Sequence, residues 1–199
     1  DDLAFDLTVI GAGHAGCEAS LAAVRLGCSV LLVTLDLDRL AAMSCNPAIG
    51  GLGKGHIVKE IDALGGMMGL AADWSGIQFR VLNRSKGPAV RGTRSQNDMK
   101  QYQEFWFELL KHRPAGVTGI EGEVTGLKKK NSEFLVTIDE DRTFASKTVV
   151  LTAGTFLGGL MYTGLKSRPG GRLGDRASNK LPDELRAFGL KLGRLKTGT

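Results

Sequence analysis

Leu7-Thr8-Val9-Ile10-Gly11-Ala12-Gly13-His14-Ala15-Gly16 is the stretch of sequence that decides the fold. A short run typical of a buried strand leads directly into Gly-x-Gly-x-x-Gly, and residues 17–26 have a helical pattern. A strand, a glycine turn and a helix in this order are typical of the first βα unit of a dinucleotide-binding fold. Gly11 permits the tight turn, Gly13 lets a pyrophosphate approach the backbone, and Gly16 lets the helix pack on the strand. The sequence therefore predicts an α/β, Rossmann-like domain with a nucleotide site at residues 11–16.

The composition is that of an ordinary soluble globular protein. The chain has 199 residues, of which 42% are hydrophobic and 24% are charged, enough for one domain or one domain and part of another. No apolar run approaches the roughly 20 residues of a membrane helix, and no signal peptide precedes the first strand. Cys17, Cys28 and Cys45 form no C-x-x-C pair, which argues against zinc and against a disulfide scaffold. We expect a reduced, cytoplasmic compartment and no metal.

The net charge of +5 is a mild sign of a polyanionic partner, and its distribution is more informative. Two basic groups stand out, one in an acid-free stretch and one near the end of the chain: Arg80, Arg84, Lys86, Arg91 and Arg94, and then Lys166, Arg168, Arg172 and Arg176. Solvated loops explain both groups equally well. Charge alone therefore leaves a nucleic-acid partner open.

The second parallel strand is expected at Ser29–Leu35, which is short, apolar and β-branched. In dinucleotide-binding folds an acidic residue at the end of this strand binds the ribose. Thr34 occupies that place here, and Asp36 follows two residues later. This pattern disfavours NAD at the site and leaves the ribose contact between Thr34 and Asp36.

Further along the chain the hydrophobic period changes. It predicts a helix over 56–70, a strand over 77–82, an amphipathic helix over 99–110, a small antiparallel β-meander over about 117–147 and a buried strand over 148–154. This order resembles that of two-dinucleotide-binding-domain flavoproteins of the glutathione reductase type. In these proteins a meander crosses between the halves of the FAD domain, so the order favours FAD over NAD at the first site.

Several loops resemble those of the MnmG family, also called GidA. Besides the first glycine loop, they are Met43–His56 (MSCNPAIGGLGKGH), Ser85–Arg91 (SKGPAVR), Gly170–Asp175 (GGRLGD) and Gly193–Thr199 (GRLKTGT). The likeness runs essentially from end to end. It implies that residues 1–199 are the N-terminal part of the FAD-binding domain, with an NADH-binding insertion and a helical C-terminal domain outside this chain.

The resemblance implies an FAD-dependent enzyme of tRNA modification. The family works with the GTPase MnmE to place an aminomethyl or carboxymethylaminomethyl group on carbon 5 of the wobble uridine. Methylenetetrahydrofolate supplies the carbon, glycine or ammonium supplies the amine, and NADH is the reductant. The resemblance also implies a homodimer for the full-length protein, and a fragment of 199 residues is expected to be inactive alone.

The resemblance also implies site residues. FAD contacts are expected at Gly11, Ala12, Gly13, His14, Ala15 and Gly16, at Val124 in the meander and at Ser178. The pair Arg176-Ala177 departs from the family, where a proline-containing pair usually precedes the serine.

Cys45 is the candidate catalytic residue. Alkylation of uracil at carbon 5 commonly begins when a thiolate adds to carbon 6. Lys54 and His56 follow in the same glycine-rich loop and favour a lowered thiol pKa. The alternative is that Cys45 fills a turn near the flavin.

Five basic residues are candidates for substrate contacts: Lys54, Arg84, Lys86, Arg91 and Arg94. They would contact tRNA phosphates, folate carboxylates or the edge of the flavin, and the sequence does not separate these roles. Alternatives for the whole chain are an FAD-dependent oxidoreductase of small molecules and a non-catalytic nucleotide- or RNA-binding fragment. The Cys-Asn-Pro and Lys-Gly-Pro loops argue against the first, and the Cys-Asn-Pro loop also fits MnmG better than the related tRNA methyltransferase TrmFO.

Overall fold

The computed structural model describes residues 4–43, 46–112, 116–172, 174 and 176–196. The chain divides into two compact units, which we call the sheet unit (Asp1–Asp38 and Gly116–Thr199) and the inserted unit (Arg39–Ala115). The sheet unit is therefore built from two separated parts of the sequence. In the part of the chain that the structure describes, no helix is long and apolar enough to cross a membrane.

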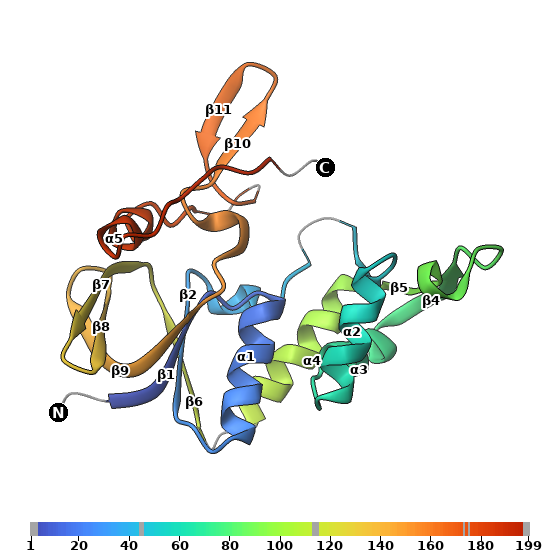
Figure 1. Ribbon diagram of the computed structural model, residues 1–199, viewed down its shortest axis with the longest axis horizontal. Coiled ribbons are helices and arrows are strands. Elements are labelled where there is room, and N and C mark those ends of the chain that lie inside the picture. Colours follow the sequence, from blue (N-terminus) through green and yellow to red (C-terminus); the bar gives the residue numbers. More distant parts are fainter. Residues whose placement is uncertain (1–3, 44–45, 113–115, 173, 175, 197–199) are drawn as a thin grey trace. The chain divides into compact units, whose positions relative to one another are not determined.

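The sheet unit contains a six-stranded sheet in the order β6-β2-β1-β9-β8-β7 (Figure 1). Its strands are β1 (Ala4–Ile10), β2 (Val30–Thr34), β6 (Val117–Glu121), β7 (Val124–Lys130), β8 (Glu133–Ile138) and β9 (Arg142–Leu151). The first four in sheet order are parallel, and α1 (His14–Arg25) connects β1 to β2. The expected Rossmann-like α/β architecture is confirmed.

The meander differs from the expectation in two ways. Val117–Glu121 pairs in parallel with β2, so the antiparallel meander comprises only β7, β8 and β9. The strand expected at 148–154 is the second half of β9 and not a separate element. This is because β9 pairs antiparallel with β8 on one side and parallel with β1 on the other, and Ala145 takes part in both ladders.

The core of the sheet unit lies between the sheet and α5 (Leu181–Ala187). One buried cluster combines residues of both: Phe5, Ile10, Leu31, Val33, Val124, Leu127, Val136, Ile138, Leu181 and Leu185. Because successive strand residues point to opposite faces, Val9 and Leu32 face the other side of the sheet, where Cys17 and Leu21 of α1 are buried. Both faces of the parallel strands are therefore covered.

After β9 the chain forms the short 3-10 helix η3 (Gly154–Phe156) and a hairpin of β10 (Leu160–Thr163) and β11 (Lys166–Pro169). Leu157 then forms an isolated parallel bridge with Ser178. This bridge brings the segment before α5 back beside the end of β9.

The inserted unit has a three-stranded antiparallel sheet in the order β3-β5-β4, formed by Ala48–Gly50, Gly92–Asn97 and Gly76–Leu82. Its helices are α2 (Lys54–Ala63), α3 (Met68–Trp74), α4 (Met99–His112) and the 3-10 helix η2 (Pro88–Val90), while η1 (Leu37–Arg39) spans the boundary of the two units. The helix expected over 56–70 is two helices, because the chain turns at Gly65, whose φ is 81°. Tyr102 and Trp106 of α4 are fully buried, so the aromatic stripe belongs to the core.

Candidate functional site

The glycine loop between β1 and α1 needs glycine at two of its positions. Gly11 has a φ of 102°, and a Cβ atom there would lie 2.5 Å from the carbonyl oxygen of Thr152. A Cβ atom at Gly16 would lie 1.8 Å from the carbonyl oxygen of Gly11. Both neighbours are backbone atoms that cannot rotate away. These two glycines therefore set the path of the loop.

Gly13 is different, because nothing in the protein lies within 4 Å of an added Cβ atom. It is the N-cap residue of α1, its φ is −71°, and no side chain caps the helix. The first turn of α1 also holds no acidic residue. Uncapped N–H groups and the positive end of the helix dipole favour an anion. The open space at Gly13 is thus suited to a pyrophosphate group.

Thr152, the residue directly after the neighbouring strand β9, fixes this loop. Its hydroxyl donates to the carbonyl oxygens of Gly11 at 2.8 Å and Ile10 at 3.1 Å. Sequence reasoning did not select Thr152, although the Thr-Ala-Gly that ends a buried strand was a usable signal.

Val124 and Ser178 lie in segments that the structure joins. Val124 is buried at the start of β7, and the preceding residue, Glu123, accepts a hydrogen bond from the Asn179 backbone N–H at 2.8 Å. The Glu123 backbone N–H in turn holds the pKa of Asp139 below its usual value. A network of backbone and carboxylate groups therefore connects the meander to the segment that carries Ser178.

The Ser178 side chain is 7% exposed, and its hydroxyl has no hydrogen-bond partner among the described residues. Its backbone is fixed on both sides, since Ser178 N–H donates to Phe156 at 2.9 Å and Gly158 N–H donates to Ser178 at 2.7 Å. Buried hydroxyl groups normally have partners. An orphaned and rigidly held hydroxyl therefore indicates a position for a polar ligand atom.

The carboxyl end of β2 holds the two candidates for the ribose contact. The Thr34 hydroxyl donates to the Asp36 carbonyl at 3.3 Å, and the Asp36 carboxylate accepts from the Asp38 N–H at 2.8 Å. Glu121, at the end of β6, accepts from the Leu37 N–H at 3.1 Å. Sequence reasoning missed Glu121 because only the pairing of β6 with β2 brings it to this edge.

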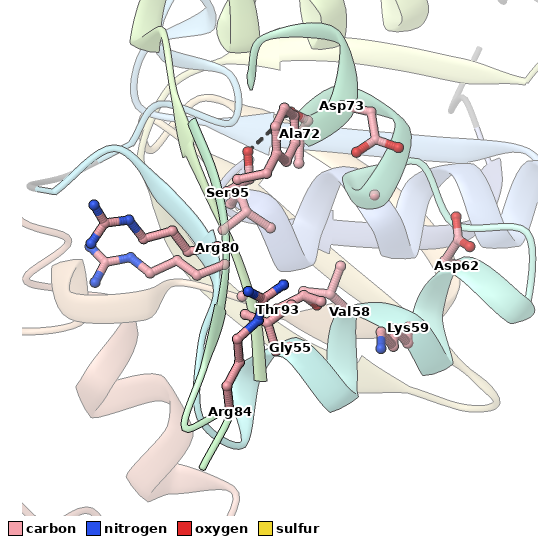
Figure 2. Close-up of a pocket in the computed structure, with 16 residues that line it drawn as sticks. Gly55, Val58, Lys59, Asp62, Ala72, Asp73, Arg80, Arg84, Thr93 and Ser95 are labelled. Atoms are coloured by element: carbon pink, nitrogen blue, oxygen red, sulfur yellow. Dashed lines mark hydrogen bonds between the residues drawn. The ribbon is translucent and has the colours of Figure 1, made fainter. Parts of the chain in front are cut away.

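The inserted unit contains a separate open cavity of about 670 Å³ between α2, α3 and the three-stranded sheet (Figure 2). Lys59, Asp62 and Asp73 line it from the helices. Of the predicted substrate residues, Arg84 and Arg94 line this cavity.

The other predicted substrate residues are exposed elsewhere in the inserted unit. Lys54 is the first residue of α2, and Lys86 and Arg91 flank η2, where Arg91 donates to the Lys86 carbonyl at 3.2 Å. Cys45 lies outside the described residues. Across the ranges that the structure does describe, no three His, Cys, Asp or Glu side chains are grouped to hold a metal ion.

The sequence is similar to proteins of a known family. Residues 6–199 match the family described as glucose inhibited division protein A. The chain is 53% identical over 196 residues to a protein of Geobacter sulfurreducens, and 52% identical over 196 residues to one of Chlamydia trachomatis. Both are named tRNA uridine 5-carboxymethylaminomethyl modification enzyme MnmG. These alignments cover 98% of this chain but 31% and 32% of the relatives, so the chain spans about a third of their length.

Solved structures of GidA and of a GidA-related protein are also similar to this chain. GidA of Aquifex aeolicus is 46% identical with a TM-score of 0.87, over 92% of this chain and 30% of that one. A GidA-related protein of Thermus thermophilus is 19% identical with a TM-score of 0.66, over 94% of this chain and 69% of that one. The second likeness concerns the fold alone.

Proposed function

Because the chain belongs to the glucose inhibited division protein A family, we propose that it forms the FAD-binding part of a tRNA-modifying enzyme. The observation that carries the proposal is the open space at Gly13, in front of an uncapped helix and beside a loop that Gly11 and Gly16 constrain. The relatives named as modification enzymes are about three times as long as this chain. The reaction is therefore proposed for the whole protein.

The residues of the sheet unit fit FAD at several points. The loop 11–16 and the N-terminus of α1 would bind the pyrophosphate, and Thr34 or Asp36 would bind the ribose. The Ser178 hydroxyl, which has no partner among the described residues, would form a hydrogen bond with the cofactor. The backbone at Val124 would line the same site. When bound, FAD supplies the redox chemistry of its flavin ring, and NADH is the proposed reductant.

The proposed substrate chemistry uses Cys45. Its thiolate would add to carbon 6 of the wobble uridine, so that carbon 5 becomes the nucleophile toward a one-carbon unit from methylenetetrahydrofolate. Glycine or ammonium would supply the amine, and the GTPase MnmE and a second copy of the full-length protein are the proposed partners. Lys54, Arg84, Lys86, Arg91 and Arg94 would contact tRNA phosphates or folate carboxylates.

The test is a visible absorption spectrum of the purified chain before and after addition of FAD. A flavin band that survives desalting in the wild-type chain, and is absent in Gly13→Ala, supports the proposed site. If added FAD leaves no band in the wild-type chain, residues 1–199 do not hold the cofactor as proposed. In the full-length protein, Cys45→Ser should keep the flavin band and lose tRNA modification. Retained modification would contradict the role of Cys45.

A further inference from the structure

Two arginines face each other across strands of the inserted unit. In the ladder between β4 and β5, Arg80 lies directly opposite Arg94. In the ladder between β3 and β5, Arg94 lies opposite Gly50. A row of Gly50, Arg94 and Arg80 therefore crosses the three-stranded sheet, and Gly50 presents no side chain.

This pairing is unfavourable by itself. Directly opposed residues have Cβ atoms about 4.5–5.5 Å apart, and like charges in that position destabilise a sheet. The sequence offers no compensation nearby, since residues 75–97 contain no aspartate or glutamate. Among the residues that the structure describes, neither Arg80 nor Arg94 takes part in an ion pair.

Arg80 and Arg94 are among the residues that line the cavity of Figure 2, as are Asp62 and Asp73, so the direction of each side chain decides whether these charges meet. The Ser95 hydroxyl donates to the Ala72 carbonyl at 3.4 Å, so Ser95 faces α3. Because side chains alternate along a strand, Arg94 and its partner Arg80 face away from the helices. Figure 2 shows the Arg80 side chain extending away from Asp62 and Asp73. The two helix carboxylates therefore do not neutralise the arginine pair.

The neighbouring row adds donors and no negative charge. It consists of Gln96, which lies opposite Gln78 on one side and Ala48 on the other. The Gln96 amide donates to the Asn46 side chain at 3.3 Å. This face of the sheet thus combines two guanidinium groups with amides, which is the donor chemistry that suits an oxyanion.

We propose that Arg80 and Arg94 together bind one oxyanion group, a phosphate or a carboxylate, of a ligand on this face of the inserted unit. A guanidinium group presents parallel N–H donors that match two oxygens of such a group. A shared anion converts the repulsion between the arginines into two attractive interactions. The proposal deepens the substrate role given above to Arg94 by pairing it with Arg80, and it does not depend on the FAD site, which lies in the sheet unit.

Thermal unfolding of the chain tests this proposal. The sequence has two tryptophans, Trp74 and Trp106, and both belong to the inserted unit, so their fluorescence reports that unit. At low ionic strength without phosphate, Arg80→Gln and Arg94→Gln should each raise the unfolding midpoint by about 1–5 °C. Inorganic phosphate should raise the midpoint of the wild-type chain above that in sodium chloride of equal ionic strength, and both variants should lose this increment.

The matched control is Arg168→Gln, which removes the same charge from the exposed strand β11 and should keep the phosphate increment. Arg80→Lys keeps the charge but not the paired N–H donors, so it should reduce the rise of the unfolding midpoint that phosphate causes. An increment in Arg80→Gln and Arg94→Gln equal to that of the wild-type chain would overturn the proposal, as would lower midpoints in both variants without phosphate. The same measurement with glutarate in place of phosphate distinguishes a carboxylate ligand from a phosphate ligand. The anion that raises the unfolding midpoint more identifies the group. Both glutamine variants should keep the flavin band, so the two proposals fail separately.

Discussion

The Thr152 hydroxyl donates a hydrogen bond of 2.8 Å to the carbonyl oxygen of Gly11, 141 residues away in the sequence. The carbonyl oxygen of Thr152 lies only 2.5 Å from the position of a Cβ atom on Gly11. The end of β9 therefore both binds the glycine loop and excludes a side chain from it. The loop that would receive a pyrophosphate is therefore shaped by the segment that follows β9, the strand that pairs with β1 although it is distant in the sequence.

Thr152→Val should separate this shaping role from simple stabilisation. Thr148 provides the control, because its hydroxyl, within β9, donates to the Asp6 carbonyl at 2.8 Å and not to the glycine loop. Each valine variant should lose about 1 kcal/mol of unfolding free energy in urea denaturation, the usual contribution of one hydrogen bond. Only Thr152→Val should weaken FAD binding in a fluorescence titration. Equal FAD affinity in the two variants would contradict the proposed link between β9 and the loop.

Alanine at Gly16 and at Gly13 should give opposite kinds of defect. A Cβ atom at Gly16 would collide with backbone, so Gly16→Ala should cost about 1–3 kcal/mol of unfolding free energy or more. At Gly13 the added atom meets no protein atom, and the change should stay within about 0.5 kcal/mol. Because that atom enters the proposed pyrophosphate space, Gly13→Ala should weaken FAD binding more than about tenfold. Urea denaturation and FAD titration measure the two effects, and a stable Gly13→Ala with normal FAD affinity would contradict the assignment.

Ser178→Ala should affect binding without affecting folding. Its hydroxyl is buried and unpartnered, so removing it should change the unfolding free energy by less than about 1 kcal/mol, in either direction. Losing one hydrogen bond to FAD should reduce the affinity about 3- to 10-fold. Ser146→Ala is the control, because the buried Ser146 hydroxyl already donates to the Thr148 carbonyl at 2.7 Å. That variant should lose stability and keep FAD affinity, and the reverse pattern would exclude Ser178 as a ligand contact.

Local sequence signals were sufficient where an element is defined by its own pattern. The strand, glycine turn and helix at 4–25, the strand β2 and the amphipathic helix α4 all follow from apolar spacing and glycine positions. The pattern did not predict β5, which lies between β3 and β4 although its residues are Gly-Thr-Arg-Ser-Gln-Asn. It is held by tertiary hydrogen bonds, such as that from the Asn97 amide to the Ala72 carbonyl at 2.7 Å. Such bonds leave no periodic trace in a sequence.

The candidate site divides in the same way. The glycines of the loop can be identified from the sequence alone, because each has a fixed place in a known motif. Glu121 and Glu123 act through strand order and through contacts between distant segments, so single-sequence reasoning had no means to select them. For Thr152 the Thr-Ala-Gly after the buried strand was a signal, but its contact with Gly11 appears only in the fold. The role of Cys45 stays a prediction.

One ion pair predicts how stability depends on pH. The Asp6 carboxylate accepts hydrogen bonds from Lys147 Nζ at 2.7 Å and from the backbone N–H and hydroxyl of Ser29 at 2.8 and 2.9 Å. The Lys147 bond, followed by those from Ser29, holds the pKa of Asp6 well below its usual range. The same pair raises the pKa of Lys147.

Because the pKa of Asp6 is lower in the folded chain than in the unfolded chain, the charged carboxylate stabilises the fold above the unfolded pKa of about 3.9. This contribution should be lost as the pH falls from about 5 toward the folded pKa. Asp6→Asn should therefore be less stable than the wild-type chain at pH 7, and the difference should shrink steadily below pH 4. Urea denaturation between pH 7 and pH 2 measures it, with the exposed Asp141→Asn as control. A difference between wild type and Asp6→Asn that stays constant down to pH 2 would show that the bonds to Asp6 do not depend on its charge.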